Sequence, residues 1–291
     1  MKLARNSGVW GSVLALSVLI TGCGRGGEAA APPQASTVTV TTQAPETGEP
    51  DETANWTGKM TARYDEATSP EAIKGRDLMQ QNNLLDDMAD SINEGLKLPQ
   101  DIPLIGTQCD EANAFWSPDE KSMTICYEDA ADGLDIYTQL GDPDPTAAAL
   151  NAEWATFFHE TGHMVIDLYG LPAVGREEDA ADQLAAYLLL APGPDGKIDP
   201  ASVQAVKDFA REFEEYDARS GEIETEQFAD EHSMNLTRMY NLECWVYGAD
   251  PEANADLVTD GSLPEERADR CADEYQQLSD SWSILLEPYL K

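Results

Sequence analysis

The sequence has few basic residues. Its 291 residues include 18 Lys and Arg against 55 Asp and Glu, which gives a formal net charge of −37. This excess of negative charge repels phosphate groups, so nucleic acids and anionic lipid surfaces are excluded as favoured partners. Histidine is also scarce, with three residues in the chain. The sequence contains no internal repeat and no EF-hand calcium loop.

Long apolar runs are missing as well, and the apolar stretch at residues 9–20 is too short to span a bilayer comfortably. Lys2 and Arg5 precede it, as in a signal peptide. The stretch leads into Thr21-Gly22-Cys23, which resembles the lipobox of bacterial lipoproteins. This resemblance implies that Cys23 is lipidated and anchors the chain on the extracytoplasmic face of a bacterial membrane. An ordinary secretory signal is the alternative.

Cysteine is limited to five residues, of which four follow Cys23. An even number in an oxidising compartment predicts two disulfides. Three pairings are open, and we favour Cys109 with Cys126 and Cys244 with Cys271 because each pair lies within one local unit. Closing a loop of this size stabilises a fold by roughly 3 kcal/mol in the chain-entropy model.

Composition divides the chain into three segments. Residues 1–22 are the predicted signal peptide, 23–56 a flexible tether rich in Ala, Pro and Thr, and 57–291 one domain. Apolar spacing in the domain predicts helices over 70–98, 145–169, 177–190, 200–219, 225–247 and 264–290. Short β-type runs at 112–116 and 122–127 predict a hairpin. We therefore predict a mainly helical α+β domain with a small antiparallel sheet or hairpin.

The predicted helix over 145–169 contains His159-Glu160-Thr161-Gly162-His163, an H-E-x-x-H motif. Histidines four residues apart lie on one helix face, so both can bind one metal ion. Glu160 lies beside that pair and can accept a proton from a metal-activated water. The motif also occurs by chance in helices, but here it holds two of the three histidines. We predict a site for one zinc ion with Glu160 as the catalytic base.

A catalytic zinc site needs a third protein ligand. Glu178 and Asp182 form an E-x-x-x-D pattern shortly after the motif. Together the two segments resemble the gluzincin metallopeptidases, in which a second helix supplies this pattern. The resemblance implies that Glu178 is the third ligand and that Asp182 accepts a hydrogen bond from His159. Glu177 and Asp179 remain open as alternative ligands.

Residues 57–290 also resemble a bacterial family of unknown function described as putative metallopeptidases, on the segments 157–190, 230–233 and 244–248. The gluzincin likeness implies that a later histidine stabilises the oxyanion, and His232, Arg238 and Tyr240 are candidates. His232 as an ordinary surface residue is the alternative. Zincins pair extended substrate with an edge strand, for which 114–116 or 123–125 is available; a purely structural hairpin is the alternative.

These observations predict a membrane-tethered zinc metallopeptidase with a zincin-like fold that acts on a peptide or protein. A zinc amidase acting on cell-wall peptide is an alternative within the same chemistry. A lipoprotein that binds metal without catalysis is the alternative from another class, although an intact Glu160 argues against it, because a structural site has no need of a general base.

Overall fold

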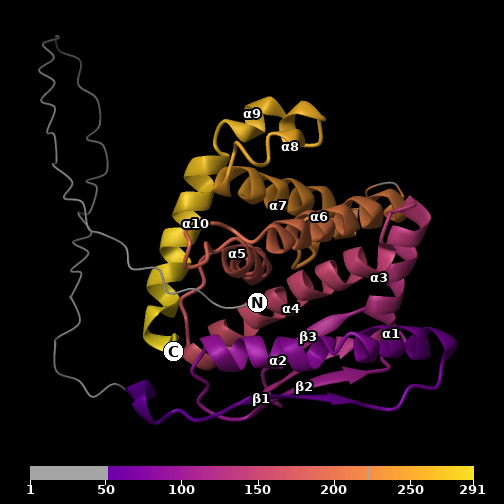
Figure 1. Ribbon diagram of the computed structural model, residues 1–291, viewed down its shortest axis with the longest axis vertical. Helices are drawn as coiled ribbons and strands as arrows, with labels where there is room; N and C mark the ends of the chain where they lie inside the picture. The colour runs from indigo at the N-terminus through magenta and orange to yellow at the C-terminus, as the bar shows by residue number, and fades with distance from the viewer. Residues whose placement is uncertain (1–51, 222, 224) are drawn as a thin grey trace, which may run out of the picture.

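The computed structural model describes residues 52–221, 223 and 225–291. Cys23 and the predicted signal peptide lie outside these residues. The described chain combines helices with one four-stranded sheet (Figure 1), which confirms the mainly helical α+β class. Among the described residues, no helix has both the length and the apolar character needed to cross a membrane.

The sheet has the strand order β1-β2-β4-β3. The strands are β1 (Met60–Tyr64), β2 (Ile102–Thr107), β3 (Ala114–Ser117) and β4 (Ser122–Cys126). The predicted hairpin is the antiparallel pair β3–β4, in which Ala114 lies opposite Ile125. The other two pairs, β1–β2 and β2–β4, are parallel, so the sheet is mixed rather than antiparallel throughout. β3 is the edge strand beside β4, which is interior.

Several helices begin at side-chain caps that the sequence supplies. The helix α4 (Pro145–Tyr169) starts after Asp144, whose carboxylate accepts a hydrogen bond from the amide of Ala147, and it ends at Gly170 with φ 60°. α5 (Glu177–Leu189) has three acidic residues in its first turn, where the helix dipole favours negative charge. The remaining helices are α1 (Pro70–Gln81), α2 (Leu84–Gly95), α3 (Tyr127–Leu140), α6 (Pro200–Ser220), α7 (Asn235–Ala249), α8 (Asp256–Thr259), α9 (Glu265–Ala268) and α10 (Cys271–Leu286).

Three predicted helices are divided in the structure. The predicted helix over 70–98 breaks between α1 and α2 at Asn83, which has φ 51°. The predicted helix over 225–247 consists of a short 3-10 turn (Thr225–Ala229) and α7, so His232 lies in the loop between them. The predicted helix over 264–290 is divided between α9 and α10. The helix α3 was not predicted.

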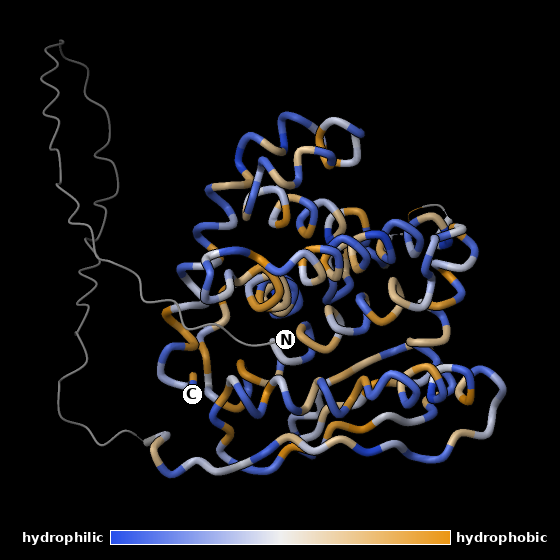
Figure 2. The backbone as a smooth tube through the Cα atoms, in the orientation of Figure 1, coloured by the Kyte–Doolittle hydropathy of each residue, from blue (hydrophilic) through white to orange (hydrophobic). Residues whose placement is uncertain are grey.

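The helices lie in layers on the sheet. α4 contacts β3 and β4, and α1 and α2 pack against β1 and β2. α5 lies at the centre of Figure 1, seen end-on, with α4 on one side of it and α6 and α7 on the other. Its buried residues are almost all apolar, and Figure 2 shows this centre as hydrophobic. Lys291 lies beside the end of α2, where its amide donates to the carbonyl of Gly95.

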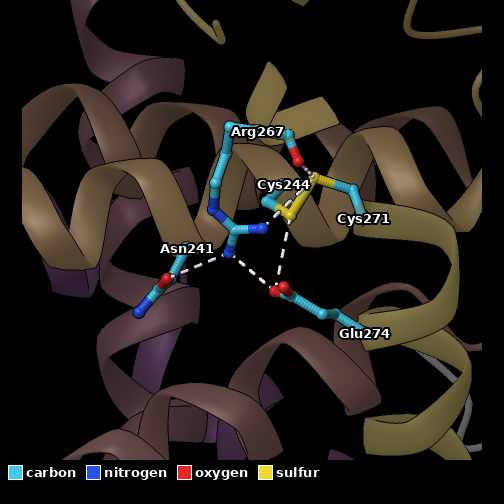
Figure 3. The surroundings of a disulfide bond; sticks show 5 residues. All are labelled: Asn241, Cys244, Arg267, Cys271 and Glu274. Carbon is cyan, nitrogen blue, oxygen red and sulfur yellow. Dashed lines mark hydrogen bonds and ion pairs between the residues drawn. A yellow bond between two sulfur atoms is a disulfide. The ribbon is translucent and has the colours of Figure 1, made fainter. Parts of the chain in front are cut away.

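Both favoured disulfides are present, Cys109–Cys126 and Cys244–Cys271. Cys109–Cys126 links the loop before the hairpin to the end of β4. Cys244–Cys271 joins α7 to the first residue of α10, and Figure 3 shows the side chains around it. Arg267 donates hydrogen bonds there to Asn241 (3.3 Å) and Glu274 (2.7 Å), which adds polar links around the same joint. This disulfide therefore fixes α7 against α10.

Candidate metal centre

Two histidines on α4 face one point in space. His159 and His163 are one turn apart, and their Nε2 atoms lie 3.3 Å from each other. The opposite side of the helix is buried, with Phe157, Phe158 and Val165 in the core. This packing fixes the rotation of α4 about its axis, so that its polar face is held toward the cleft beside β3.

α5 approaches α4 closely at a glycine. A Cβ atom on Gly162 would lie 2.6 Å from the Cα of Ala181, so the two helices can pack at this distance only without a side chain there. The close approach brings Glu178, in the first turn of α5, up to the two histidines. Its Oε2 atom lies 3.2 Å from Nε2 of His159 and 3.3 Å from Nε2 of His163.

The other ring nitrogens of the two histidines are already engaged. Nδ1 of His159 lies 2.8 Å from Asp182 Oδ1, and Nδ1 of His163 lies 2.9 Å from Glu177 Oε1. A carboxylate only accepts hydrogen bonds, so each neutral ring carries its proton on Nδ1 and directs the Nε2 lone pair at the other histidine. Two lone pairs and a carboxylate oxygen that face one another form a favourable arrangement only around a cation.

These three side chains have the donor set of a metal site. One ligand atom from each of His159, His163 and Glu178 lies within 4.8 Å of the other two. The Oε2 atom of Glu178 is buried among the imidazole nitrogens that face it. Two imidazoles and one carboxylate, with room for a further ligand, is a set found in catalytic zinc sites. We call these three residues the ligand triad.

The structure separates Glu178 from the two neighbouring acids that the sequence left open. Glu177 binds the far nitrogen of His163, and Asp179 accepts a hydrogen bond from Ser233 Oγ at 2.7 Å. Only Glu178 of these three faces both Nε2 atoms. The choice follows from helix geometry, since successive residues differ by about 100° around the axis.

A buried arginine on α7 holds the partner of His159. Arg238 donates to Asp182 through Nε (2.8 Å) and Nη2 (2.7 Å), and both side chains are nearly inaccessible to solvent. Burial alone would raise the pKa of Asp182, but Arg238 and His159 outweigh it and lower that pKa. Asp182 therefore stays ionised and keeps accepting from His159 Nδ1.

The carboxylates around the histidines favour a positive charge at this point. Burial lowers the pKa of His159, but its hydrogen bonds to Asp182 and Glu178 outweigh burial and raise that pKa to about 9. Burial raises the pKa of Glu178, whereas the neighbouring imidazoles of His159, His163 and His232 lower it well below its usual range. The surroundings thus stabilise a cation between the histidines, whether a proton or a metal ion.

Glu160 is held next to the ligand triad by the edge strand. Its Oε2 atom accepts a hydrogen bond of 2.9 Å from the backbone amide of Trp116 in β3. Its Oε1 atom lies 4.0 Å from Nε2 of His159. The carboxylate thus has one oxygen anchored and the other directed toward the ligand triad.

A second link joins β3 to α4. Asp167 accepts hydrogen bonds from the indole of Trp116 (2.9 Å) and from Lys121 (2.6 Å). The edge strand is therefore attached to the motif helix at Glu160 and again two turns later.

His232 lies beside the ligand triad, whereas the two other oxyanion candidates do not point there. Nε2 of His232 is 3.0 Å from Glu178 Oε2, and its Nδ1 is 3.1 Å from Asp230. Its side chain is 44% exposed, so it faces the cleft. Arg238 is bound to Asp182, and Tyr240 packs against the core.

A cleft of about 330 Å³ opens over these residues. The residues that line it come from β3 and the adjoining loops, from α4, from the start of α5 and from the loop before α7; they are Asn113, Ala114, Phe115, Trp116, Pro118, His159, Glu160, His163, Glu177, Glu178, Glu231 and His232. The histidine pair, Glu178 and Glu160 thus share one solvent-accessible space, which a reaction on an external molecule requires.

Comparison with known proteins identifies a family that matches the chain. A family of unknown function, described as "Putative metallopeptidase", matches residues 64–286. The chain belongs to this family. The match confirms the resemblance drawn from the motif segments and covers nearly the whole of the described domain. No curated protein and no solved structure matches the chain.

Two features of this family member were not predicted from the sequence. The backbone amide of Trp116 that holds Glu160 has no side-chain signature, so no motif could reveal it. Arg238 was considered for the oxyanion, but it binds Asp182 instead. A buried arginine 56 residues from its carboxylate partner becomes visible only when α5 and α7 are packed together.

Proposed function

We propose that the protein is a zinc-dependent peptidase in which Glu160 acts as the general base. The observation that carries this proposal is the convergence of His159, His163 and Glu178 next to a carboxylate that is not itself part of the ligand triad. A structural metal site has no use for such a carboxylate, whereas hydrolysis requires one. The triad would hold the ion, and a bound Zn²⁺ supplies Lewis acidity that polarises a carbonyl group and acidifies a water molecule.

Glu160 removes a proton from the attacking water. The water oxygen bonds to the carbonyl carbon of the substrate, and the proton passes to Glu160. The same carboxyl group then delivers this proton to the nitrogen of the leaving amine as the C–N bond breaks. The amide of Trp116 fixes the carboxylate in position throughout, so no reorientation is needed between the two transfers.

His232 supports the negative charge that develops on the substrate oxygen. It lies at the open side of the cleft, within 3.0 Å of the ligand triad, and an imidazole N–H is a suitable donor for an oxyanion. Carboxylates raise the pKa of His232, chiefly through its hydrogen bond to Glu178, which favours the protonated, donating form.

The edge strand β3 provides backbone groups with which an extended substrate can pair. The carbonyl of Asn113 accepts from Cys126, so odd-numbered residues of β3 pair with β4. Ala114 and Trp116 therefore direct their backbone groups away from β4, toward the cleft. The Trp116 amide is taken by Glu160, and Ala114 remains to pair with substrate by strand addition. β4 is interior, so the alternative docking segment 123–125 is unavailable.

We further propose that the domain acts at the cell envelope, tethered through a lipid on Cys23. The support for this is the signal-like N-terminal sequence and the two disulfides, which belong to oxidising compartments. Its partners would then be the membrane, through the lipid, and peptide or protein substrates outside the cytoplasm.

The deciding experiment measures bound metal and peptide cleavage for the wild type, for Glu160→Gln and for the exposed control Glu120→Gln. We expect one zinc per chain in all three proteins. We expect cleavage to fall by roughly 10²–10⁴-fold in Glu160→Gln alone, because a general base contributes about that much. Zinc without cleavage in all three would favour a binding protein, and absence of zinc would overturn the proposal.

A further inference from the structure

A second pocket opens directly beside Glu160. It has a volume of about 240 Å³ and shares Ala114, His159, Glu160 and His232 with the cleft over the ligand triad. Its other walls come from α3, α6 and α7. A side chain of a molecule bound along β3 would therefore have direct access to it.

Two further carboxylates line this pocket, and a third from another helix interacts with both. Asp129 of α3 and Glu212 of α6 line it, and Glu153 of α4 interacts electrostatically with both. Glu153 and Glu212 are 3% and 6% exposed. The Oε2 atom of Glu153 is fully buried and has no hydrogen-bond partner within the described residues. We call these three residues the acidic cluster.

The backbone makes room for the cluster. A Cβ atom on Gly133 of α3 would lie 2.8 Å from Oε1 of Glu212, so the carboxylate occupies the space that any larger residue would fill. The cluster is thus accommodated between α3 and α6, rather than left at their surface.

The nearby arginines are bound to other carboxylates. Arg211 pairs with Asp142 and Asp208, Arg219 pairs with Asp132, and Arg238, which lines the same pocket, pairs with Asp182; the distances lie between 2.7 and 3.0 Å. None of them is paired with the acidic cluster. Buried carboxylates without a cationic partner, such as Glu153 and Glu212, are costly to ionise, and such groups are normally paired or bind a cation.

The geometry favours an extended organic cation over a metal ion. The ligand triad is the cluster of described residues whose donor atoms converge within 4.8 Å, and the acidic cluster does not meet that condition. A guanidinium or ammonium group on a flexible stem can reach carboxylates that are further apart. Phe209, Phe213 and Tyr216 line the same pocket and offer aromatic faces to an aliphatic stem or a cation.

We propose that this pocket binds the side chain of an arginine or lysine adjacent to the scissile bond, so that the substrates are peptides with a basic residue at that position. This inference rests on the proposed peptidase function. Asp129 and Glu212 line the pocket, and a basic side chain that enters it stabilises their ionised form and is selected by that charge. The position of the pocket beside Glu160 sets where the bond is cut.

The first experiment compares the metal-loaded protein on matched peptides that carry Arg, Lys, Leu or Glu at one varied position on either side of the cleavable bond. We expect kcat/KM for Arg or Lys to exceed that for Leu by at least about tenfold, since a site built for a polar group discriminates strongly against its absence. Glu212→Gln and Asp129→Asn should reduce this preference for a basic residue. Glu214→Gln, exposed on the same helix, is the control.

The second experiment needs no catalysis. L-arginine amide and its uncharged analogue L-citrulline amide are titrated into the wild type, Glu212→Gln and Glu214→Gln by calorimetry. We expect arginine amide to bind the wild type and Glu214→Gln at least about tenfold more tightly than citrulline amide, and Glu212→Gln to lose this difference. Equal binding of the two amides to the wild type would overturn the inference, as would a second bound metal ion that Glu212→Gln removes.

The two experiments together separate this inference from the proposed function. Binding of arginine amide without cleavage of any peptide would support the pocket and contradict the peptidase. Cleavage without preference for a basic residue, together with equal binding of the two amides, would contradict the pocket and leave the peptidase in place. Both glutamate variants should fold, because Glu→Gln preserves shape and removes repulsion from Glu212.

Discussion

At the residue scale, one carboxylate organises the candidate metal centre without belonging to the ligand triad. Asp182 accepts from His159 and from both Nε and Nη2 of Arg238. It fixes which nitrogen of His159 carries the proton and links α4, α5 and α7 in one buried chain of contacts. The E-x-x-x-D pattern in the sequence predicts the contact with His159. Arg238 adds the second contact, and its positive charge explains why Asp182 stays ionised although it is buried.

Asp182→Asn should therefore cost both stability and metal affinity. The substitution leaves Arg238 buried without its counter-charge, and breaking such a pair costs about 3–5 kcal/mol. Loss of the support behind His159 should weaken zinc binding by roughly 10–100-fold. Chemical denaturation and competition with a chelator would measure the two effects.

The control for this substitution is Asp135→Asn. Asp135 pairs with Lys74 at the surface and its side chain is 55% exposed, so the loss should be at most about 1 kcal/mol. Similar losses of stability for the two variants would show that the buried pair contributes no more than the surface pair.

At the element scale, the site depends on how closely α5 packs against α4. Sequence patterns gave the two helices well: the predicted range 145–169 is the observed α4, and 177–190 exceeds α5 by one residue. Asp144 and Pro145 mark the start of α4 and glycine marks its end, whereas acidic residues in the first turn mark the start of α5. The distance between the two helices could not be predicted from either helix alone. The role of Gly162 depends on Ala181, which lies opposite it on α5.

The substitution Gly162→Ala tests this contact, because helix propensity predicts a more stable protein whereas the contact with Ala181 predicts a less stable one. Within an isolated helix the change should stabilise, because alanine is favoured over glycine by about 1 kcal/mol. Against Ala181 the added Cβ must push the helices apart, which typically costs about 1–3 kcal/mol and moves Glu178 from the histidines. We expect lower stability and weaker metal binding in thermal and chelator titrations; a stabilised protein with unchanged affinity would contradict the role of Gly162.

Other elements escaped prediction for identifiable reasons. α3 follows β4 with no intervening residue, so the change from strand to helix has no turn residues to mark it. The break at Asn83 requires a left-handed backbone in a run of residues whose apolar spacing continues across it. The parallel pairs join strands that are not adjacent in the sequence: α1 and α2 lie between β1 and β2, and β3 lies between β2 and β4. Such pairing depends on the crossover segments and leaves no local turn signal.

At the scale of the whole molecule, acidic residues have different effects at the surface and in the interior. Most of the acidic residues in the described part of the chain are exposed, and their charge favours solubility. The acidic cluster is different, because burial raises the pKa of Asp129 to about 7 and raises those of Glu153 and Glu212 well above their usual values. Repulsion among the carboxylates adds to the effect of burial.

These raised pKa values predict stability that falls with increasing pH. A carboxyl group whose pKa is higher in the folded state holds its proton more tightly there, so stability decreases as pH rises from about 4, the unfolded value, toward the folded value of about 7 for Asp129. Metal-free wild type should lose on the order of 1–3 kcal/mol relative to Glu212→Gln across this range. Denaturation at pH 4.5 and pH 7.5 gives the comparison, and a parallel pH dependence of the two proteins would contradict it.

The Cys244–Cys271 disulfide gives the metal centre a dependence on redox conditions, although no cysteine belongs to the site. It anchors α7, and α7 carries Arg238, which holds Asp182 and through it His159. Dithiothreitol in an assay buffer is therefore expected to lower activity by loosening this helix. Such a loss would not identify the protein as a thiol enzyme, and purification under non-reducing conditions follows as a practical requirement.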